Sequence, residues 1–138
     1  MMQIQQYTWA NFDEDIEILV RTIRQNMDMK QIETVYGVPR GGSILGVVLS
    51  HRLGITFSSG LVDSVNHDCL WCDDIIDSGR TLAKAKEQQW NGYVALINRY
   101  KQTTLCARII DNENWIIFPW EDVEKAEQDY REYHASNK

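Results

Sequence analysis

The chain has 138 residues, of which 43% are hydrophobic, and its formal net charge at pH 7 is -6. This length and apolar content are typical of one sizeable core, so residues 1–138 are expected to fold as a single domain. The acidic balance provides no broad basic surface for a phosphodiester backbone, which argues against nucleic acid as the main partner. Any phosphate must therefore be bound locally.

No apolar run approaches the roughly 18 residues of a membrane span. The first residues, MMQIQQYTWANF, lack the basic start and apolar core of a signal peptide. We therefore expect a cytoplasmic protein with no membrane partner. The three cysteines are an odd number without a secretory context, so a disulfide framework is not expected. Cys69 and Cys72 form a C-x-x-C pair, but they lie in the strand-like run CLWCDD, which disfavours redox or metal chemistry.

The first predicted element is a surface helix near the N-terminus, where Ile16, Leu19, Ile23 and Met27 follow helical spacing. A strand is predicted next in the β-branched and aromatic run ETVYGV. A glycine turn follows in PRGG, and a buried helix is predicted in SILGVVLSHRL, ending before Gly54. These three segments make a strand, turn and helix unit.

A second unit of the same kind follows along the chain. A weak extended segment is expected in ITFSSGLV, a buried strand in CLWCDD and a helix of strong helix formers in TLAKAKEQQW. Further strands are predicted in GYVALI, TLCARII and WIIF. The last segment, EDVEKAEQDYREYHA, predicts an amphipathic helix with one apolar side formed by Val123, Ala126, Tyr130 and Tyr133. Alternating strands and helices indicate an α/β fold with a mainly parallel sheet, in which ligands bind beyond the carboxyl ends of the strands.

The stretch with the clearest chemistry is DDIIDSGRTL, which begins at Asp73. Asp73 and Asp74 are expected to end a strand at the ligand edge, and the following turn leads into a helix whose free N–H groups favour an anion. Gly79 allows a tight turn there, and the hydroxyls of Ser78 and Thr81 add donors. The aspartates would repel a bare phosphate. A ligand that fits presents hydroxyls or a divalent cation to them and a phosphate to the turn, as a sugar phosphate does.

A second anion-binding segment is predicted at the same edge of the sheet, in VYGVPRGG. Gly41 and Gly42 allow the backbone to approach an anion closely, and Arg40 offers a planar fork suited to phosphate oxygens. The sequence therefore predicts two phosphate sites beside two carboxylates that can accept from ribose hydroxyls.

Each motif also has a simpler interpretation. A pair of aspartates at a strand end is also typical of a solvated turn, or of the acidic pocket of response-regulator receivers, and PRGG alone is consistent with any turn. Trp115 and Trp120, taken alone, are more typical of a core. The two motifs at this spacing favour the sugar-phosphate interpretation. The three histidines show no metal spacing, and the absence of a Walker A pattern argues against an NTPase.

Together the two motifs resemble those of the type I phosphoribosyltransferases. DDIIDSGRTL is similar to the phosphoribosyl pyrophosphate (PRPP) signature of that family, and GVPRGG is similar to its pyrophosphate loop. NWIIFPWE is similar to a late pattern of the short purine enzymes of the xanthine-guanine and hypoxanthine type, so the resemblance extends from Val35 to Glu121. It implies a single-domain type I phosphoribosyltransferase fold: a central, mainly parallel sheet flanked by helices, with a reduced hood. Because few residues separate Thr56 from Cys72, it also implies a shortened or missing flexible lid loop.

The resemblance implies transfer of a phosphoribosyl group from PRPP to a purine base, giving a nucleoside 5′-monophosphate and pyrophosphate, with Mg²⁺ as cofactor. The implied ligands are PRPP and a purine base or nucleoside monophosphate, and a homodimer is left open. An alternative hypothesis is a catalytically weak or inactive protein of the same fold that binds PRPP or a nucleotide for regulation. The enzyme is favoured because a pure binder has less need to keep Asp77.

Residue by residue, the resemblance implies three groups of site residues. Asp77 is the general base at the purine ring nitrogen, and Arg40 also belongs to the catalytic group. Asp73 and Asp74 bind the ribose hydroxyls and the metal. The whole set that binds PRPP and phosphate is Arg40, Gly41, Gly42, Asp73, Asp74, Asp77, Ser78, Gly79, Arg80 and Thr81. The base-binding set is Arg99, Lys101, Trp115 and Ile116, with Arg99 in the place of a usual lysine.

One departure concerns the backbone before Arg40. The family often has a non-proline cis peptide at this point of the pyrophosphate loop, whereas here Pro39 precedes the arginine. Proline eases the cis form of the bond before itself and not of the bond after it. The sequence therefore leaves open whether Val38-Pro39 or Pro39-Arg40 is cis.

Overall fold

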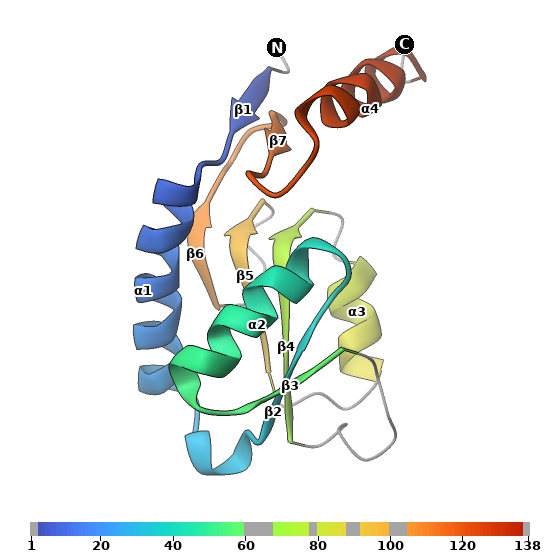
Figure 1. Ribbon diagram of the computed structural model, residues 1–138. Coiled ribbons are helices and arrows are strands. Elements are labelled where there is room, and N and C mark those ends of the chain that lie inside the picture. The colour runs from blue at the N-terminus through green and yellow to red at the C-terminus, as the bar shows by residue number, and fades with distance from the viewer. Residues whose placement is uncertain (1–2, 60–67, 78–79, 88–91, 100–104, 137–138) are drawn as a thin grey trace. The chain divides into compact units, whose positions relative to one another are not determined.

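The computed structural model describes residues 3–59, 68–77, 80–87, 92–99 and 105–136 (Figure 1). The chain forms two compact units, one of Glu14–Asp111 and the other of Met1–Asp13 with Asn112–Lys138. The boundary near the N-terminus falls within helix α1 (Trp9–Asn26).

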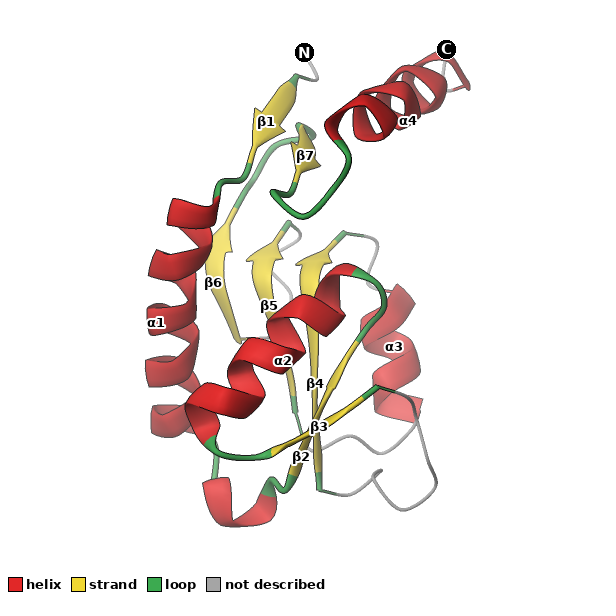
Figure 2. Ribbon diagram, viewed as in Figure 1, coloured by secondary structure: helices red, strands yellow, loops and turns green. Residues whose placement is uncertain are grey.

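The larger unit contains a five-stranded sheet whose strands all pair in parallel (Figure 2). Its order is β3-β2-β4-β5-β6. The strands are β2 (Thr34–Gly37), β3 (Thr56–Ser58), β4 (Cys69–Ile76), β5 (Tyr93–Asn98) and β6 (Leu105–Ile109). The predicted α/β fold with a parallel central sheet is therefore confirmed.

The connections of this sheet diverge between β2 and β4. From β2 the chain passes through α2 (Gly41–Leu53) to β3 on one side, and from β4 it passes through α3 (Arg80–Glu87) to β5 on the other side. Both helices therefore begin at the carboxyl edge of the sheet, as Figure 1 shows. Such a point of divergence leaves a crevice beyond the strand ends, which is where open parallel sheets bind ligands.

Helix α2 begins at Gly41, two residues before the predicted SILGVVLSHRL, and the described part of α3 begins at Arg80, one residue before the predicted TLAKAKEQQW. In α1, Ile16, Leu19 and Ile23 are buried, as their helical spacing predicted. A short 3-10 helix (η1, Met29–Gln31) follows it. Helix α2 ends at Leu53, as predicted, and is capped by Gly54, whose φ of 69° is a left-handed conformation that glycine adopts without steric cost.

Strand β4 is longer than predicted. It continues through Ile75 and Ile76, which pair with Ile97 and Asn98 of β5. The prediction that Asp73 and Asp74 end the strand was therefore wrong by two residues. The reason is that the β-branched pair after the aspartates finds hydrogen-bonding partners on the neighbouring strand.

The smaller unit contains a second sheet of two short parallel strands, β1 (Ile4–Gln6) and β7 (Trp115–Ile117), and helix α4 (Val123–Ser136). The predicted strand in WIIF exists, but it pairs with β1. The core of the smaller unit is aromatic and includes Tyr7, Phe12, Phe118 and Trp120.

The predicted apolar side of α4 is only partly covered. Ala126 is buried and Tyr130 is half-buried, whereas Val123 and Tyr133 are exposed. Tyr133 instead packs its ring against Trp115, with 5.3 Å between ring centroids. Among the helices in the described ranges, none is long and apolar enough to cross a membrane.

Candidate active site

The carboxylate pair lies on β4, near its carboxyl end. Asp73 is buried, with 9% of its surface exposed, and Asp74 is half-buried. Each side chain accepts a hydrogen bond from the next backbone amide: Asp74 N donates to Asp73 Oδ1 at 2.8 Å, and Ile75 N donates to Asp74 Oδ1 at 2.8 Å. Both carboxylates are therefore anchored to the strand that carries them.

A further donor comes from the neighbouring strand. Tyr93, the first residue of β5, donates its hydroxyl to Asp73 Oδ2 at 3.1 Å and is 2% exposed. The sequence motifs did not reveal this contact. The sequence predicted GYVALI only as a strand, and nothing in that apolar run singled out Tyr93.

Burial changes the protonation of the carboxylate pair. Removal from water, and then the nearby charge of Asp74, raise the pKa of Asp73 to about 8. Burial also raises the pKa of Asp74. The raised pKa favours the protonated form of Asp73 near neutral pH, and a ligand that brings a cation or hydroxyl donors favours release of this proton.

The predicted pyrophosphate loop connects β2 with α2. Its Pro39-Arg40 peptide bond is cis, which answers the question left open by the sequence. The side chain of Arg40 is exposed, and α2 begins at the next residue, Gly41.

Gly42 packs this helix start against the carboxylate strand. A Cβ atom on Gly42 would lie 2.7 Å from the carbonyl oxygen of Cys72 and 3.3 Å from Asp73 Oδ1. A Cβ atom on Gly37 would collide with the backbone of Gly42. The two glycines therefore allow the start of α2 to approach β2 and β4 closely. Gly37 was not among the predicted site residues, although a glycine at a strand end beside PRGG is a visible indication of such an approach.

The predicted phosphate turn follows β4. Ser78 and Gly79 lie outside the described residues, as do residues 60–67, where the lid loop was predicted to be shortened or missing. Asp77 is exposed, Arg80 is exposed at the first position of α3, and Thr81 is half-buried.

The predicted general base and one predicted base-binding residue form an ion pair. Arg99 Nε, just after β5, lies 3.0 Å from Asp77 Oδ1, just after β4. The side chain of Arg99 is 10% exposed and that of Asp77 is 63% exposed. The structure therefore brings together two residues that the sequence placed in different functional sets.

The other predicted base-binding residues are Lys101, Trp115 and Ile116. Lys101 lies outside the described residues, and Trp115 and Ile116 belong to the smaller unit. Ile116 is buried there, and Trp115 packs against Tyr130 and Tyr133 of α4.

The carboxylate oxygens of Asp73 and Asp74 suit a hard cation that takes its remaining ligands from a substrate. Among the described residues, no three His, Cys, Asp or Glu side chains gather into a metal cluster. Mg²⁺ commonly uses only one or two carboxylates and takes its other ligands from water and substrate phosphates, so Asp73 and Asp74 fit that ion.

Cys69 and Cys72 are buried, and burial raises the pKa of Cys69 to about 11 and that of Cys72 well above its usual value. Both thiols are therefore poor nucleophiles at neutral pH.

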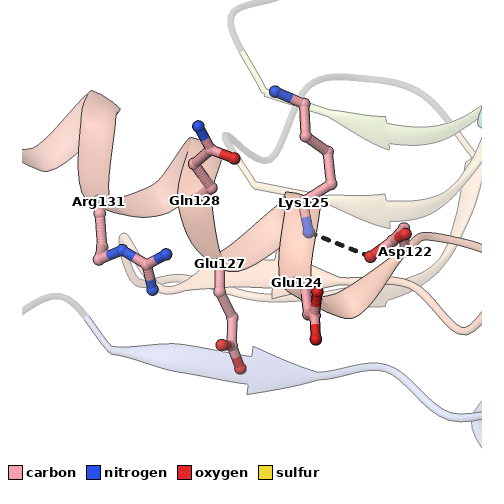
Figure 3. A pocket seen from close by; sticks show the side chains of 6 residues that line it. All are labelled: Asp122, Glu124, Lys125, Glu127, Gln128 and Arg131. Carbon is pink, nitrogen blue, oxygen red and sulfur yellow. Dashed lines mark hydrogen bonds between the residues drawn. The ribbon is translucent and has the colours of Figure 1, made fainter.

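A separate depression of about 410 Å³ lies on the surface of the smaller unit (Figure 3). All six of its lining residues come from α4 and the residue before it. They are Asp122, Glu124, Lys125, Glu127, Gln128 and Arg131. Mixed charges along one helix surface do not provide the converging polar groups of a built ligand site, so we place no function there.

Comparisons with solved structures identify the fold. A purine phosphoribosyltransferase from Pyrococcus horikoshii Ot3 is similar with 25% identity and a TM-score of 0.70, over 88% of this chain and 96% of that chain. A xanthine-guanine-hypoxanthine phosphoribosyltransferase from Helicobacter pylori is similar with 20% identity and a TM-score of 0.71, over 94% of this chain and 99% of that chain.

A hypothetical protein from Neisseria gonorrhoeae, solved with bound ppGpp, is similar with 18% identity and a TM-score of 0.68, over 93% of this chain and 96% of that chain. No family model matches the sequence, and no curated protein matches it. The structural neighbours support phosphoribosyltransferase as the general class. The chain has the type I phosphoribosyltransferase fold, and its predicted resemblance to the short purine members of that family is confirmed.

Proposed function

We propose that this protein transfers the phosphoribosyl group of PRPP to a purine base and releases pyrophosphate. The observation that carries the proposal is the close packing of Gly42, at the start of α2, against Asp73 on β4. This packing joins a glycine turn suited to an anion and a carboxylate suited to sugar hydroxyls at the point where the sheet connections diverge. PRPP requires both kinds of group within one short distance.

The proposed roles follow the chemistry of the substrate. Asp73 and Asp74 accept hydrogen bonds from the ribose hydroxyls. Pyrophosphate binds at the start of α2, where Arg40, Gly41 and Gly42 provide a guanidinium fork and accessible backbone amides. The proposed residues for the 5′-phosphate follow β4 and include the first residues of α3: Asp77, Ser78, Gly79, Arg80 and Thr81.

Mg²⁺ is the proposed cofactor. Asp73 and Asp74 would hold it together with oxygens of PRPP, and when bound it neutralises charge on the departing pyrophosphate. The chain's own contribution is to release the proton that the aspartate pair holds, since a cation and hydroxyl donors both favour the ionised carboxylates.

The reaction breaks the bond between the anomeric carbon and a pyrophosphate oxygen and forms a bond from that carbon to a purine nitrogen. The nitrogen must lose a proton, and Asp77 is the proposed acceptor. The Arg99 guanidinium, 3.0 Å from Asp77, supports this role because it orients the exposed carboxylate. Arg99 and Lys101 are proposed to recognise the 6-oxo group, and Trp115 and Ile116 to contact the base.

The test is a reaction of the purified protein with PRPP, Mg²⁺ and a panel of purine bases, followed by release of pyrophosphate and formation of the nucleotide. Equal amounts of both products with at least one base are expected. The matched control is the Asp77→Asn variant. Absence of nucleotide with every base would contradict the proposal.

A second candidate function is nucleotide binding for regulation, in a protein of this fold with little or no turnover. The observation that favours it is the similar fold of the Neisseria gonorrhoeae protein solved with ppGpp. Calorimetric titration with ppGpp and with nucleoside 5′-monophosphates separates the two candidates. Tight binding of ppGpp without turnover of any base supports the regulatory function.

A further inference from the structure

Tyr93 and the backbone of Asp74 fix both oxygens of the Asp73 carboxylate. Oδ2 accepts from the Tyr93 hydroxyl at 3.1 Å, and Oδ1 accepts from Asp74 N at 2.8 Å. A carboxylate held by a donor on each oxygen cannot rotate about its last bond without losing one of these contacts. An ionised carboxylate has acceptor positions beyond these two contacts.

The Tyr93 ring is itself held in place. It lies opposite Trp71 in the register of β4 and β5 and stacks on it, with 6.5 Å between centroids and 27° between planes. Trp71 in turn meets Tyr36 edge to face, with 4.8 Å between centroids. Because these rings are buried, the Tyr93 hydroxyl points towards Asp73 from a fixed platform.

We infer that Tyr93 is a positioning residue for sugar recognition: it holds Asp73 so that the carboxylate's remaining acceptor positions meet ribose hydroxyls, which makes the site selective for ribose 5-phosphates over sugars that lack those hydroxyls. This inference rests on the proposed function, since it assumes that Asp73 faces the sugar of PRPP or of a nucleotide. It adds a residue from a strand that carries neither of the two sequence motifs.

A purely structural role makes a different prediction. If the Tyr93 hydroxyl only satisfies a buried carboxyl group, its removal weakens the fold and affects every ligand alike. If it positions Asp73, its removal weakens ligands with ribose hydroxyls and leaves ligands without them unchanged. The coupling between the protein hydroxyl and the sugar hydroxyls therefore distinguishes the two roles.

The experiment is a cycle of binding measurements with guanosine 5′-monophosphate and its 2′,3′-dideoxy analogue on the wild type and the Tyr93→Phe variant. The wild type is expected to favour the ribonucleotide by about tenfold or more, the scale of hydrogen bonds to a charged group. In Tyr93→Phe this ratio is expected to fall to about threefold or less, with unchanged affinity for the dideoxy analogue. Tyr36→Phe, in the same aromatic cluster, is the matched control and keeps the wild-type ratio.

The outcomes separate the inference from the proposed function. If the wild type binds neither nucleotide, the proposed function fails and the inference falls with it. If the wild type discriminates and a folded Tyr93→Phe protein discriminates equally, only the inference is overturned. The Asp73→Asn variant keeps the inference falsifiable if Tyr93→Phe does not fold: a retained ratio in Asp73→Asn overturns the inference, because Tyr93 then has no carboxylate through which to act.

Discussion

Arg99 Nε lies 3.0 Å from Asp77 Oδ1, so a nearly buried guanidinium holds an exposed carboxylate at the carboxyl edge of the sheet. The two residues follow neighbouring strands, β4 and β5, which pair in parallel register up to Ile76 and Asn98. This register brings the residues after both strands to the same edge. In the proposed reaction, the residue that accepts the purine proton and a residue that recognises the purine therefore act as one pair.

Asp77→Asn should separate binding from chemistry. The amide has nearly the volume of the carboxylate, so affinity for nucleoside 5′-monophosphates is expected to stay within about twofold, while turnover falls by roughly 10²- to 10⁴-fold, the usual contribution of a general acid or base. Both quantities should be measured on one preparation, by calorimetry and by nucleotide formation. Equal turnover of variant and wild type would show that another group accepts the proton.

Arg99→Met should change which bases are used. Loss of the guanidinium removes a charged hydrogen-bond donor, so use of 6-oxo purines is expected to fall by about 10- to 100-fold in kcat/KM relative to 6-amino purines. Arg99→Lys keeps the charge and should retain most of the preference. Arg131→Met, on the exposed surface of α4, is the control for loss of one arginine. The same loss with both classes of base would mean that Arg99 acts only through Asp77.

Much of the secondary structure of the larger unit could be predicted because short sequence patterns determine each helix, strand and turn. Glycine turns, helix formers and β-branched runs follow one another in the order strand, turn, helix, and each of these patterns reflects the conformations available to a few neighbouring residues. Pairing partners are not local. The sheet of β1 and β7 joins IQQ near one end of the chain to WII near the other, and neither short run shows an alternation that identifies its partner.

The candidate site also has residues that local motifs predict and a contact that depends on strand pairing. Asp73, Asp74, Arg40 and Gly42 could be predicted because each belongs to a continuous motif whose turn chemistry points to an anion or a sugar. The hydroxyl of Tyr93 on Asp73 depends on the register between β4 and β5. A one-residue change of register would turn that side chain to the other face of the sheet, so no motif within one segment reveals the contact.

Gly42→Ala should damage the fold and the site together. The new Cβ would lie 2.7 Å from the carbonyl oxygen of Cys72 and 3.0 Å from Asp73 Cα, both backbone atoms that cannot move independently. A loss of about 1–3 kcal/mol in the free energy of unfolding is expected, as for other overpacked positions, together with weaker PRPP binding. Val47→Ala, on the exposed side of the same helix, is the control. Denaturant unfolding checks the prediction, and unchanged stability would show that α2 can shift away from β4.

Asp73 should make stability fall as pH rises. Its pKa in the folded protein is raised from 3.8 to about 8, so the folded state binds the proton more tightly than the unfolded state does. The stabilisation from this carboxyl group is complete below pH 3.8 and is lost as pH rises through about 8. The slope for one proton is at most about 1.4 kcal/mol per pH unit. Asp73→Asn should flatten the dependence on pH. A wild-type stability that rises across this interval would contradict the prediction.

Two ion pairs on α1 should differ in their value to the fold. Asp15, which is 1% exposed, receives two hydrogen bonds from Arg108 of β6, from Nε at 2.9 Å and from Nη2 at 3.0 Å. Asp15→Ala removes the partner of a partly buried guanidinium, and a loss of about 3 kcal/mol in the free energy of unfolding is expected. Glu17 pairs with Arg52 just as closely, but both side chains are well exposed, at 58% and 40%.

Glu17→Ala is therefore the matched control for Asp15→Ala: it removes one acidic residue of the same helix and an ion pair that water can replace, so little change in stability is expected. Urea unfolding of the two variants beside the wild type measures the difference directly. Added salt should leave the difference between Asp15→Ala and wild type nearly constant, because the Asp15 carboxylate is shielded from ions. Equal losses in the two variants would mean that burial of Asp15 does not strengthen its pairing with Arg108.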